Sequence, residues 1–131
     1  MGVRLNHTIV WCRDRKRSAA FFTEVFGRPP AVSFGPFLVV ELDNDVSLDF
    51  LALDENEAEA IASQHYAFLV DDDEWDAIFA RVVARGLDYW ADPGKVEAEQ
   101  INHHDGGKGV YFEDPDGHLL EIITRPYGSG P

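Results

Sequence analysis

Alternation of apolar and polar positions predicts β-strands over much of the chain, and a helical period of apolar positions interrupts it twice. In the first half, Phe22, Val25 and Phe26 recur at helical spacing, and Gly27 follows them as a helix stop. Asp14 lies ahead of this run as a candidate N-cap. The first half therefore predicts a strand at 3–12, a helix at 18–26, short strands within 32–42 that Gly35 and Pro36 interrupt, and a strand at 46–53.

The second half repeats this order after an acidic, alanine-rich connector at residues 54–63. Apolar residues recur at helical spacing between Trp75 and Val83, and a loop at 91–108 is rich in Gly, Asp and His. The predicted elements are a strand at 64–70, a helix at 74–85 and strands at 87–90, 110–113 and 118–124, followed by a loose segment at 126–131.

An internal repeat of one strand, one helix and three strands indicates an α+β fold. We expect two tandem βαβββ modules within a single domain that spans residues 1–131. The first module covers about 3–53, the connector 54–63 and the second module about 64–125.

Glu121 is an acidic residue within the apolar stretch of the last predicted strand. Leu119 and Ile123 share its face, while Leu120 and Ile122 lie on the other, so this strand is apolar on both faces and should be buried. A buried carboxylate without a partner is costly. We therefore expect a cationic group or a metal ion beside Glu121.

Two histidines and two carboxylates take equivalent positions in the repeat. His7 and Asp49 lie on the opening and closing strands of the first module, 42 residues apart; His65 and Glu121 do so in the second, 56 apart. The difference of 14 residues matches an extra loop around residues 93–106. Imidazole nitrogens with carboxylate oxygens suit Fe, Zn, Ni, Mn or Co better than Ca or Mg. A divalent metal site is predicted, although each residue taken alone could be structural.

The composition and net charge limit the kinds of partner, cross-link and compartment that are expected for this protein. A net charge of −13 argues against nucleic acid and anionic membrane surfaces, and a hydrophobic content of 45% is enough to form a core. The single cysteine, Cys12, excludes an intramolecular disulfide and a CxxC metal site. Without a signal-like start or an apolar stretch near 18 residues, a cytoplasmic protein is expected.

Four segments, NHTIV, SLDFL, QHYAFLV and YFEDPDGHLLEII, resemble the vicinal oxygen chelate superfamily, and the resemblance extends over residues 3–125. That superfamily includes glyoxalase I, bleomycin-binding resistance proteins, fosfomycin-resistance thiol transferases and type I extradiol dioxygenases. The resemblance implies paired βαβββ modules whose mixed sheets form a partly closed barrel around a metal-binding cleft. It also implies a homodimer, and in several family members the site is completed across the subunit interface.

The resemblance assigns roles to five residues of this sequence. His7, His65 and Glu121 match the metal ligands of the metal-dependent branches, and Asp49 falls where glyoxalase I has a fourth ligand, a glutamate. The shorter Asp49 could bind the metal directly, act through water or serve as a base. Tyr111 falls where the fosfomycin-resistance and dioxygenase branches place a functional tyrosine, and a half-buried structural aromatic is the alternative.

The expected function is that of a metal-dependent enzyme that activates a small, oxygen-chelating substrate by Lewis-acid polarisation, with Tyr111 or Asp49 managing protons. Glyoxalase-like lyase or isomerase chemistry, thiol transfer to an epoxide and extradiol-type ring cleavage all stay open. The alternative is a non-catalytic protein of the bleomycin-resistance type that sequesters a drug or metabolite; a metal-free structural remnant is the third.

Three further histidines are open to two interpretations. His103 and His104 could act as acid or base under a lid formed by the 91–108 loop, or they could be exposed on a flexible loop without a role. His118 follows the turn before the last strand, and we expect it to be a turn or rim residue rather than a metal ligand.

Overall fold

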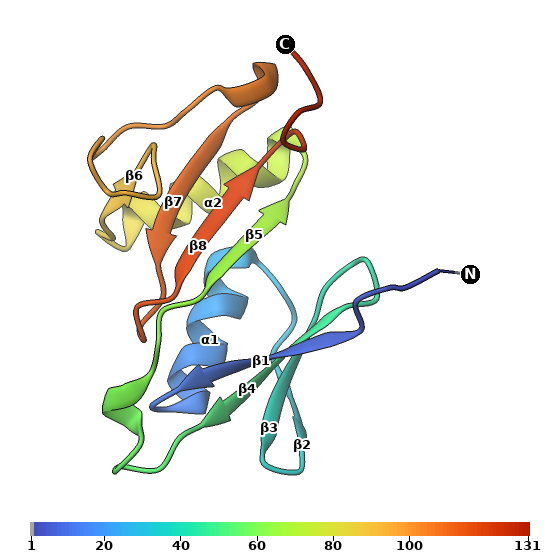
Figure 1. The fold of residues 1–131 in the computed structure, drawn as a ribbon, viewed down its shortest axis with the longest axis vertical. Helices are drawn as coiled ribbons and strands as arrows, with labels where there is room; N and C mark the ends of the chain where they lie inside the picture. Colours follow the sequence, from blue (N-terminus) through green and yellow to red (C-terminus); the bar gives the residue numbers. More distant parts are fainter. Residues whose placement is uncertain (1) are drawn as a thin grey trace. The chain divides into compact units, whose positions relative to one another are not determined.

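The computed structural model describes residues 2–131, which divide into two compact units that meet in sequence at Ala62 and Ser63. Within the described residues, each unit contains one α-helix and a four-stranded mixed sheet (Figure 1). Both units follow the order strand, helix, three strands, so the predicted α+β fold of two βαβββ modules is confirmed. None of the helices in this range has the length and apolar character that crossing a membrane requires.

The sheet of the first unit has the strand order β1–β4–β3–β2. Strands β1 (His7–Cys12) and β4 (Ser47–Ala52) run parallel. Strand β3 (Phe37–Glu41) is antiparallel to both β4 and β2 (Val32–Phe34). The short strands predicted within 32–42, interrupted at Gly35 and Pro36, are therefore confirmed as the hairpin of β2 and β3.

Helix α1 (Arg15–Phe26) is bounded by the two residues that the sequence indicated. The Asp14 side chain accepts two backbone N–H groups of the first turn, and Gly27 takes the left-handed conformation with a φ of 66°. The helix packs its apolar face on the sheet, where the rings of Phe22 and Phe50 lie 6.3 Å apart between centroids.

The first strand is shorter than its sequence pattern indicated. It begins at His7 rather than Val3, because its parallel partner β4 begins at Ser47, directly opposite His7. The N–H of Ser47 donates to the carbonyl oxygen of Asn6 at 3.0 Å, where the pairing with β4 begins, and Val3 is fully exposed. Alternation in the sequence marks which residues can form a strand, but the available partner sets where pairing starts.

The second unit repeats the same topology with the strand order β5–β8–β7–β6. Strands β5 (His65–Leu69) and β8 (Leu119–Ile123) run parallel. Strand β7 (Gly109–Glu113) is antiparallel to β8, and β6 (Tyr89–Trp90) is antiparallel to β7.

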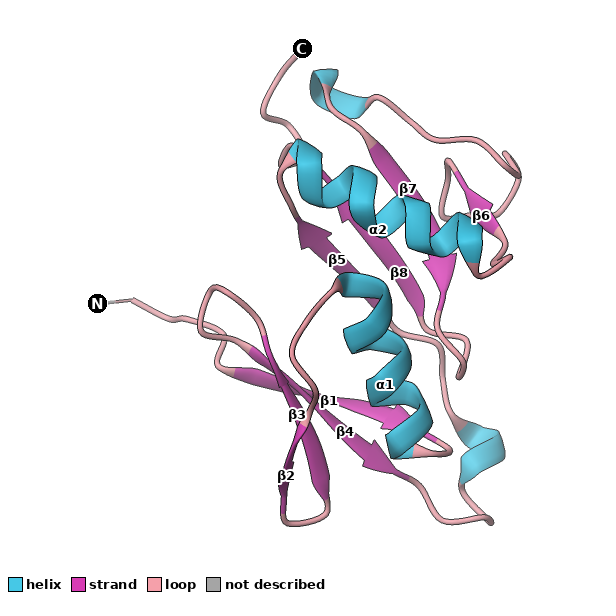
Figure 2. Ribbon diagram, turned by 180° about the vertical axis from the view of Figure 1, so that it is seen from behind, coloured by secondary structure: helices cyan, strands magenta, loops and turns pink. Residues whose placement is uncertain are grey.

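Helix α2 (Asp72–Ala84) covers one face of this second sheet, as Figure 2 shows. Trp75 is buried, and its Nε1 donates to the carbonyl oxygen of Ile122 at 3.2 Å. Val110 is paired with Ile122, and both side chains are fully buried. Because successive residues of a strand point to opposite faces, Glu121 and its paired residue Tyr111 lie on the face away from α2.

The two units differ most in the connection before their last hairpin. In the first unit, Gly35 and Pro36 join β2 to β3, whereas residues 91–108 join β6 to β7 in the second. The extra length therefore lies where the spacing of the histidines and carboxylates predicted it. This loop contains the short 3-10 helix η2 (His104–Gly106).

Candidate metal centre

The registers of the two parallel strand pairs make the repeat equivalent at the predicted ligands. In each unit the histidine opens its strand and lies opposite the residue two places before the carboxylate. His7 is thus diagonal to Asp49, and His65 is diagonal to Glu121. Residues opposite one another share a face, so each histidine is on the same side of its sheet as its carboxylate.

In the second unit, the histidine and the carboxylate are in direct contact. Nε2 of His65 lies 2.9 Å from Oε1 of Glu121. Glu121 is only 1% exposed, while the side chain of His65 keeps 43% of its surface exposed. Because a carboxylate can only accept, Nε2 of His65 is the donor in this contact. The partner that the burial of Glu121 required is therefore present.

The second oxygen of Glu121 is satisfied by Tyr127, a residue that sequence reasoning missed. The Tyr127 hydroxyl donates to Oε2 of Glu121. The Tyr111 hydroxyl oxygen lies 2.8 Å from that of Tyr127. Since the proton of Tyr127 is directed to Glu121, Tyr111 donates to Tyr127, and the three groups form one chain of hydrogen bonds. The prediction that residues 126–131 are loose was wrong.

Both tyrosines are acids that keep their protons at neutral pH. Burial raises the pKa of Tyr111 far above its usual range, and the hydrogen bonds with Tyr127 and Glu121 raise it further. Burial is also the first cause that raises the pKa of Tyr127, followed by its hydrogen bond to Glu121. The two hydroxyls therefore act as hydrogen-bond donors in this cluster and not as bases.

In the first unit, His7 and Asp49 each have a polar partner of their own. Nδ1 of His7 donates to Oδ1 of Asn6 at 2.7 Å. In a neutral ring, this leaves Nε2 as the unprotonated nitrogen, which is the form that binds metals. The Ser47 hydroxyl donates to Oδ1 of Asp49 at 2.8 Å.

The geometry of His65 and Glu121 fits a pair of metal ligands. Two ligand atoms that are each about 2.1 Å from an ion, at right angles, lie about 3 Å apart. The 2.9 Å separation of Nε2 and Oε1 is close to that spacing, and it is also the length of the hydrogen bond described above, so Nε2 would give up its proton on binding an ion. Among residues 2–131, no group of three or more His, Cys, Asp or Glu side chains is arranged to hold a metal ion.

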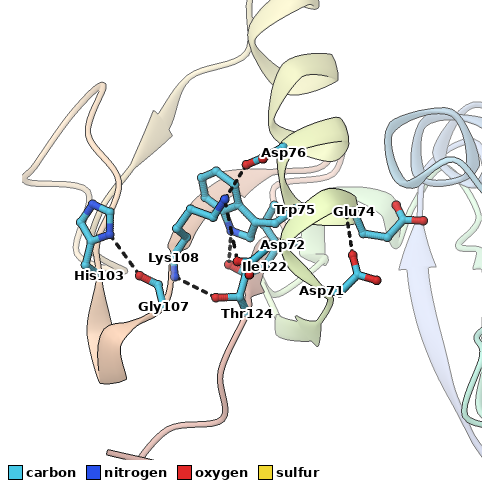
Figure 3. Close-up of polar contacts among 10 residues, drawn as sticks. All are labelled: Asp71, Asp72, Glu74, Trp75, Asp76, His103, Gly107, Lys108, Ile122 and Thr124. Carbon is cyan, nitrogen blue, oxygen red and sulfur yellow. Dashed lines mark hydrogen bonds and ion pairs between the residues drawn. The ribbon is translucent and has the colours of Figure 1, made fainter. Parts of the chain in front are cut away.

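Polar contacts to α2 and β8 hold the histidine-containing loop at its β7 end (Figure 3). Nζ of Lys108 lies 2.6 Å from Oδ1 of Asp76 and 5.0 Å from the ring centroid of Trp75, both on α2. The backbone N–H of Lys108 donates to Oγ1 of Thr124 at 2.9 Å. The Asp76 carboxylate raises the pKa of Lys108, as expected for a paired ammonium group.

The three remaining histidines have structural surroundings. Nδ1 of His103 donates to the carbonyl oxygen of Gly107 at 3.1 Å, within the loop itself (Figure 3). The ring of His104 lies edge-on to that of Tyr127, with 6.4 Å between centroids. His118 is fully buried, and its Nδ1 accepts the backbone N–H just before β5 at 3.0 Å. These contacts favour structural roles for His103 and His118.

Comparison with known proteins agrees with the resemblance inferred from the sequence. Residues 4–122 match the family model described as the Glyoxalase/Bleomycin resistance protein/Dioxygenase superfamily. The chain belongs to this superfamily.

Among curated members, the metallothiol transferase FosB of Shouchella clausii is 30% identical over 129 residues, which cover 92% of this chain and 79% of that protein. Among solved structures, the oxidase ChaP-H2 is 53% identical, with a TM-score of 0.93, over 100% of both chains. The oxidase ChaP-H1 is 55% identical, with a TM-score of 0.92, over 97% of this chain and 99% of that one.

Proposed function

We propose that this superfamily member is a metal-dependent oxidase acting on a small molecule that binds the metal through neighbouring oxygen atoms. The observation that carries the proposal is the 2.9 Å contact between Nε2 of His65 and Oε1 of Glu121, which brings together two residues that match metal ligands of the superfamily. Similarity favours oxidation over thiol transfer, because the two oxidases are 53% and 55% identical and the metallothiol transferase 30%.

His7, His65 and Glu121 would hold the ion, with Asp49 as a fourth ligand or as a nearby base. Two histidines and one carboxylate with open coordination positions are typical of non-haem Fe(II) oxygenases, so Fe(II) is the metal we propose. A bound Fe(II) would supply Lewis-acid polarisation and redox chemistry. His7 and Asp49 would come from the same chain or, in a homodimer, from the second copy.

The protein side chains near the ion would donate and accept protons during the reaction. The Tyr111 hydroxyl, which donates to Tyr127 in this structure, would turn from Tyr127 to donate a hydrogen bond to a substrate oxygen. Asp49, whose Oδ1 accepts the Ser47 hydroxyl, would serve as the base if it does not bind the ion. The ring of His65, with 43% of its side-chain surface exposed, is the part of this cluster that a small molecule would reach.

Elemental analysis of protein purified anaerobically without a metal-affinity tag tests the proposal. We expect near-stoichiometric Fe in the wild type, loss of metal in His65→Ala and Glu121→Gln, and smaller loss in Asp49→Asn. Glu113→Gln is the matched control, because Glu113 pairs with Lys95 at 2.7 Å and has no place in the predicted ligand set.

Oxygen uptake with catechols and related vicinal diols then tests the reaction. Metal-dependent uptake that Tyr111→Phe slows would support the assigned chemistry. A wild type that takes up no metal, even on reconstitution, would refute it. Bound Zn or Ni with turnover of hemithioacetals or epoxides would point to lyase or thiol-transfer chemistry instead, and ligand protection without turnover to sequestration.

A further inference from the structure

Segment 126–131, which follows β8, folds back so that the side chain of Tyr127 reaches the candidate metal centre. Tyr127 is 55% exposed as a residue, yet its hydroxyl reaches the buried Glu121 and donates to Oε2. Oε1 of the same carboxylate lies against His65. The two carboxylate oxygens of Glu121 therefore have different partners. Oε1 faces His65, the other predicted ligand, and Oε2 accepts a hydrogen bond from the hydroxyl of Tyr127.

The side chain of Asp105, in the middle of η2, holds this segment in place. Oδ2 of Asp105 accepts the backbone N–H of Gly128 and Oδ1 accepts that of Gly130, both at 3.1 Å. The last residue of the segment passes close to the same turn, since a Cβ built on Gly106 would lie 2.7 Å from a backbone carbon of Pro131. In Figures 1 and 2 the segment and η2 lie at the same end of the sheet.

We propose that Tyr127 is a positioning residue for the metal-binding carboxylate of Glu121, delivered by segment 126–131 and clamped by Asp105. The inference rests on the proposed function, because it assumes that Glu121 binds a metal. A hydroxyl that holds Oε2 leaves Oε1 to face the ion and fixes the plane of the carboxylate. Hydrogen-bond partners of this kind orient metal ligands, and their loss typically lowers metal affinity about 10–100-fold.

A competing role for Tyr127 predicts that removing its hydroxyl strengthens metal binding instead of weakening it. If the hydroxyl only occupied the position of the ion, metal would have to displace it, and its removal would tighten binding. The hydrogen bond from Tyr111 to Tyr127 favours positioning, because it fixes the hydroxyl from a second side while Oε1 stays directed at His65.

The test uses the full chain and Fe(II) alone, with affinity measured anaerobically by competition with a chromophoric chelator. We expect Tyr127→Phe to weaken Fe(II) binding about 10–100-fold. Asp105→Gly removes the clamp while keeping a residue that tolerates the positive φ of 55° there, and should weaken binding in the same direction. Tyr89→Phe is the control, since the Tyr89 ring packs against Phe79 of α2 and should leave affinity within about twofold.

Hydrogen exchange adds a readout that does not depend on the loaded enzyme. In metal-free Asp105→Gly, the amides of Gly128 and Gly130 should exchange faster than in the wild type. The double variant with Tyr127→Phe should bind Fe(II) no more weakly than Tyr127→Phe alone, because both changes act through one hydroxyl. Additive losses would overturn the clamp.

The outcomes separate this inference from the proposed function. Unchanged or tighter Fe(II) binding in Tyr127→Phe, with wild-type binding that His65→Ala abolishes, overturns the positioning role alone. A wild type that binds no Fe(II) overturns both.

Discussion

Replacing Glu121 by Leu should leave the metal-free protein at least as stable as the wild type. The change removes two hydrogen bonds to a charged acceptor, each worth about 1.5–3 kcal/mol. It also removes a carboxylate that is 1% exposed, whose desolvation costs several kcal/mol. The two donors it releases, on His65 and Tyr127, belong to side chains that are 43% and 55% exposed and can turn to water.

The balance predicts a free energy of unfolding between the wild-type value and about 3 kcal/mol above it. Urea denaturation in a strong chelator measures this; with a slope near 2 kcal/mol per molar, the midpoint should rise by up to about 1.5 M. Glu113→Leu, a replacement at a more exposed glutamate, should shift stability by no more than about 0.5 kcal/mol. A loss of more than about 1 kcal/mol in Glu121→Leu would show that Glu121 is retained for the fold and not for a ligand.

Two further predictions concern the turn and the loop of the second unit. Burial raises the pKa of Asp114 above its ordinary value of 3.8, so the folded state holds this proton more tightly; the stability it contributes is present below that value and is lost as pH rises through the raised pKa. Asp114→Asn should therefore gain in stability relative to the wild type between about pH 4 and 7, and a difference that is constant with pH would contradict this reasoning. Gly107→Ala should cost about 1–3 kcal/mol in urea denaturation, because its Cβ would lie 2.5 Å from Oγ1 of Thr124. Gly94→Ala, whose nearest contact is a surface carboxylate oxygen at 3.1 Å, should change stability by less than about 1 kcal/mol, and equal losses in the two variants would count against the packing argument.

The placement of His65 and Glu121 on one face of their sheet could be predicted, because the position of a residue along a strand decides which face its side chain lies on. Side chains alternate between faces, so a histidine and a carboxylate at matching offsets in two modules had to share a face in each. Helix ends were equally readable, since Asp14 and Gly27 act through local chemistry that needs no distant partner.

Features that depend on distant partners could not be predicted in this way. Residues 3–6 alternate like a strand, yet the ladder with β4 begins at His7, next to the hydrogen bond from the N–H of Ser47 to the carbonyl oxygen of Asn6. Tyr127 lies beyond the last strand, and the amides that follow it are held by Asp105, in a loop without periodicity. The sequence signal for Tyr127 was a tyrosine shortly after a buried strand that contains one glutamate, and such a pattern is too common to predict a contact between them.

The loop at 91–108 lengthens the second unit without changing how its histidine lies relative to its carboxylate. It replaces a turn of two residues in the other unit, yet His65 stands to Glu121 as His7 stands to Asp49. Insertions between β6 and β7 leave the register of β5 and β8 untouched, whereas one residue added inside β5 would turn His65 to the opposite face. The connection between β6 and β7 can therefore vary in length while the histidine and the carboxylate of the unit keep their relative positions.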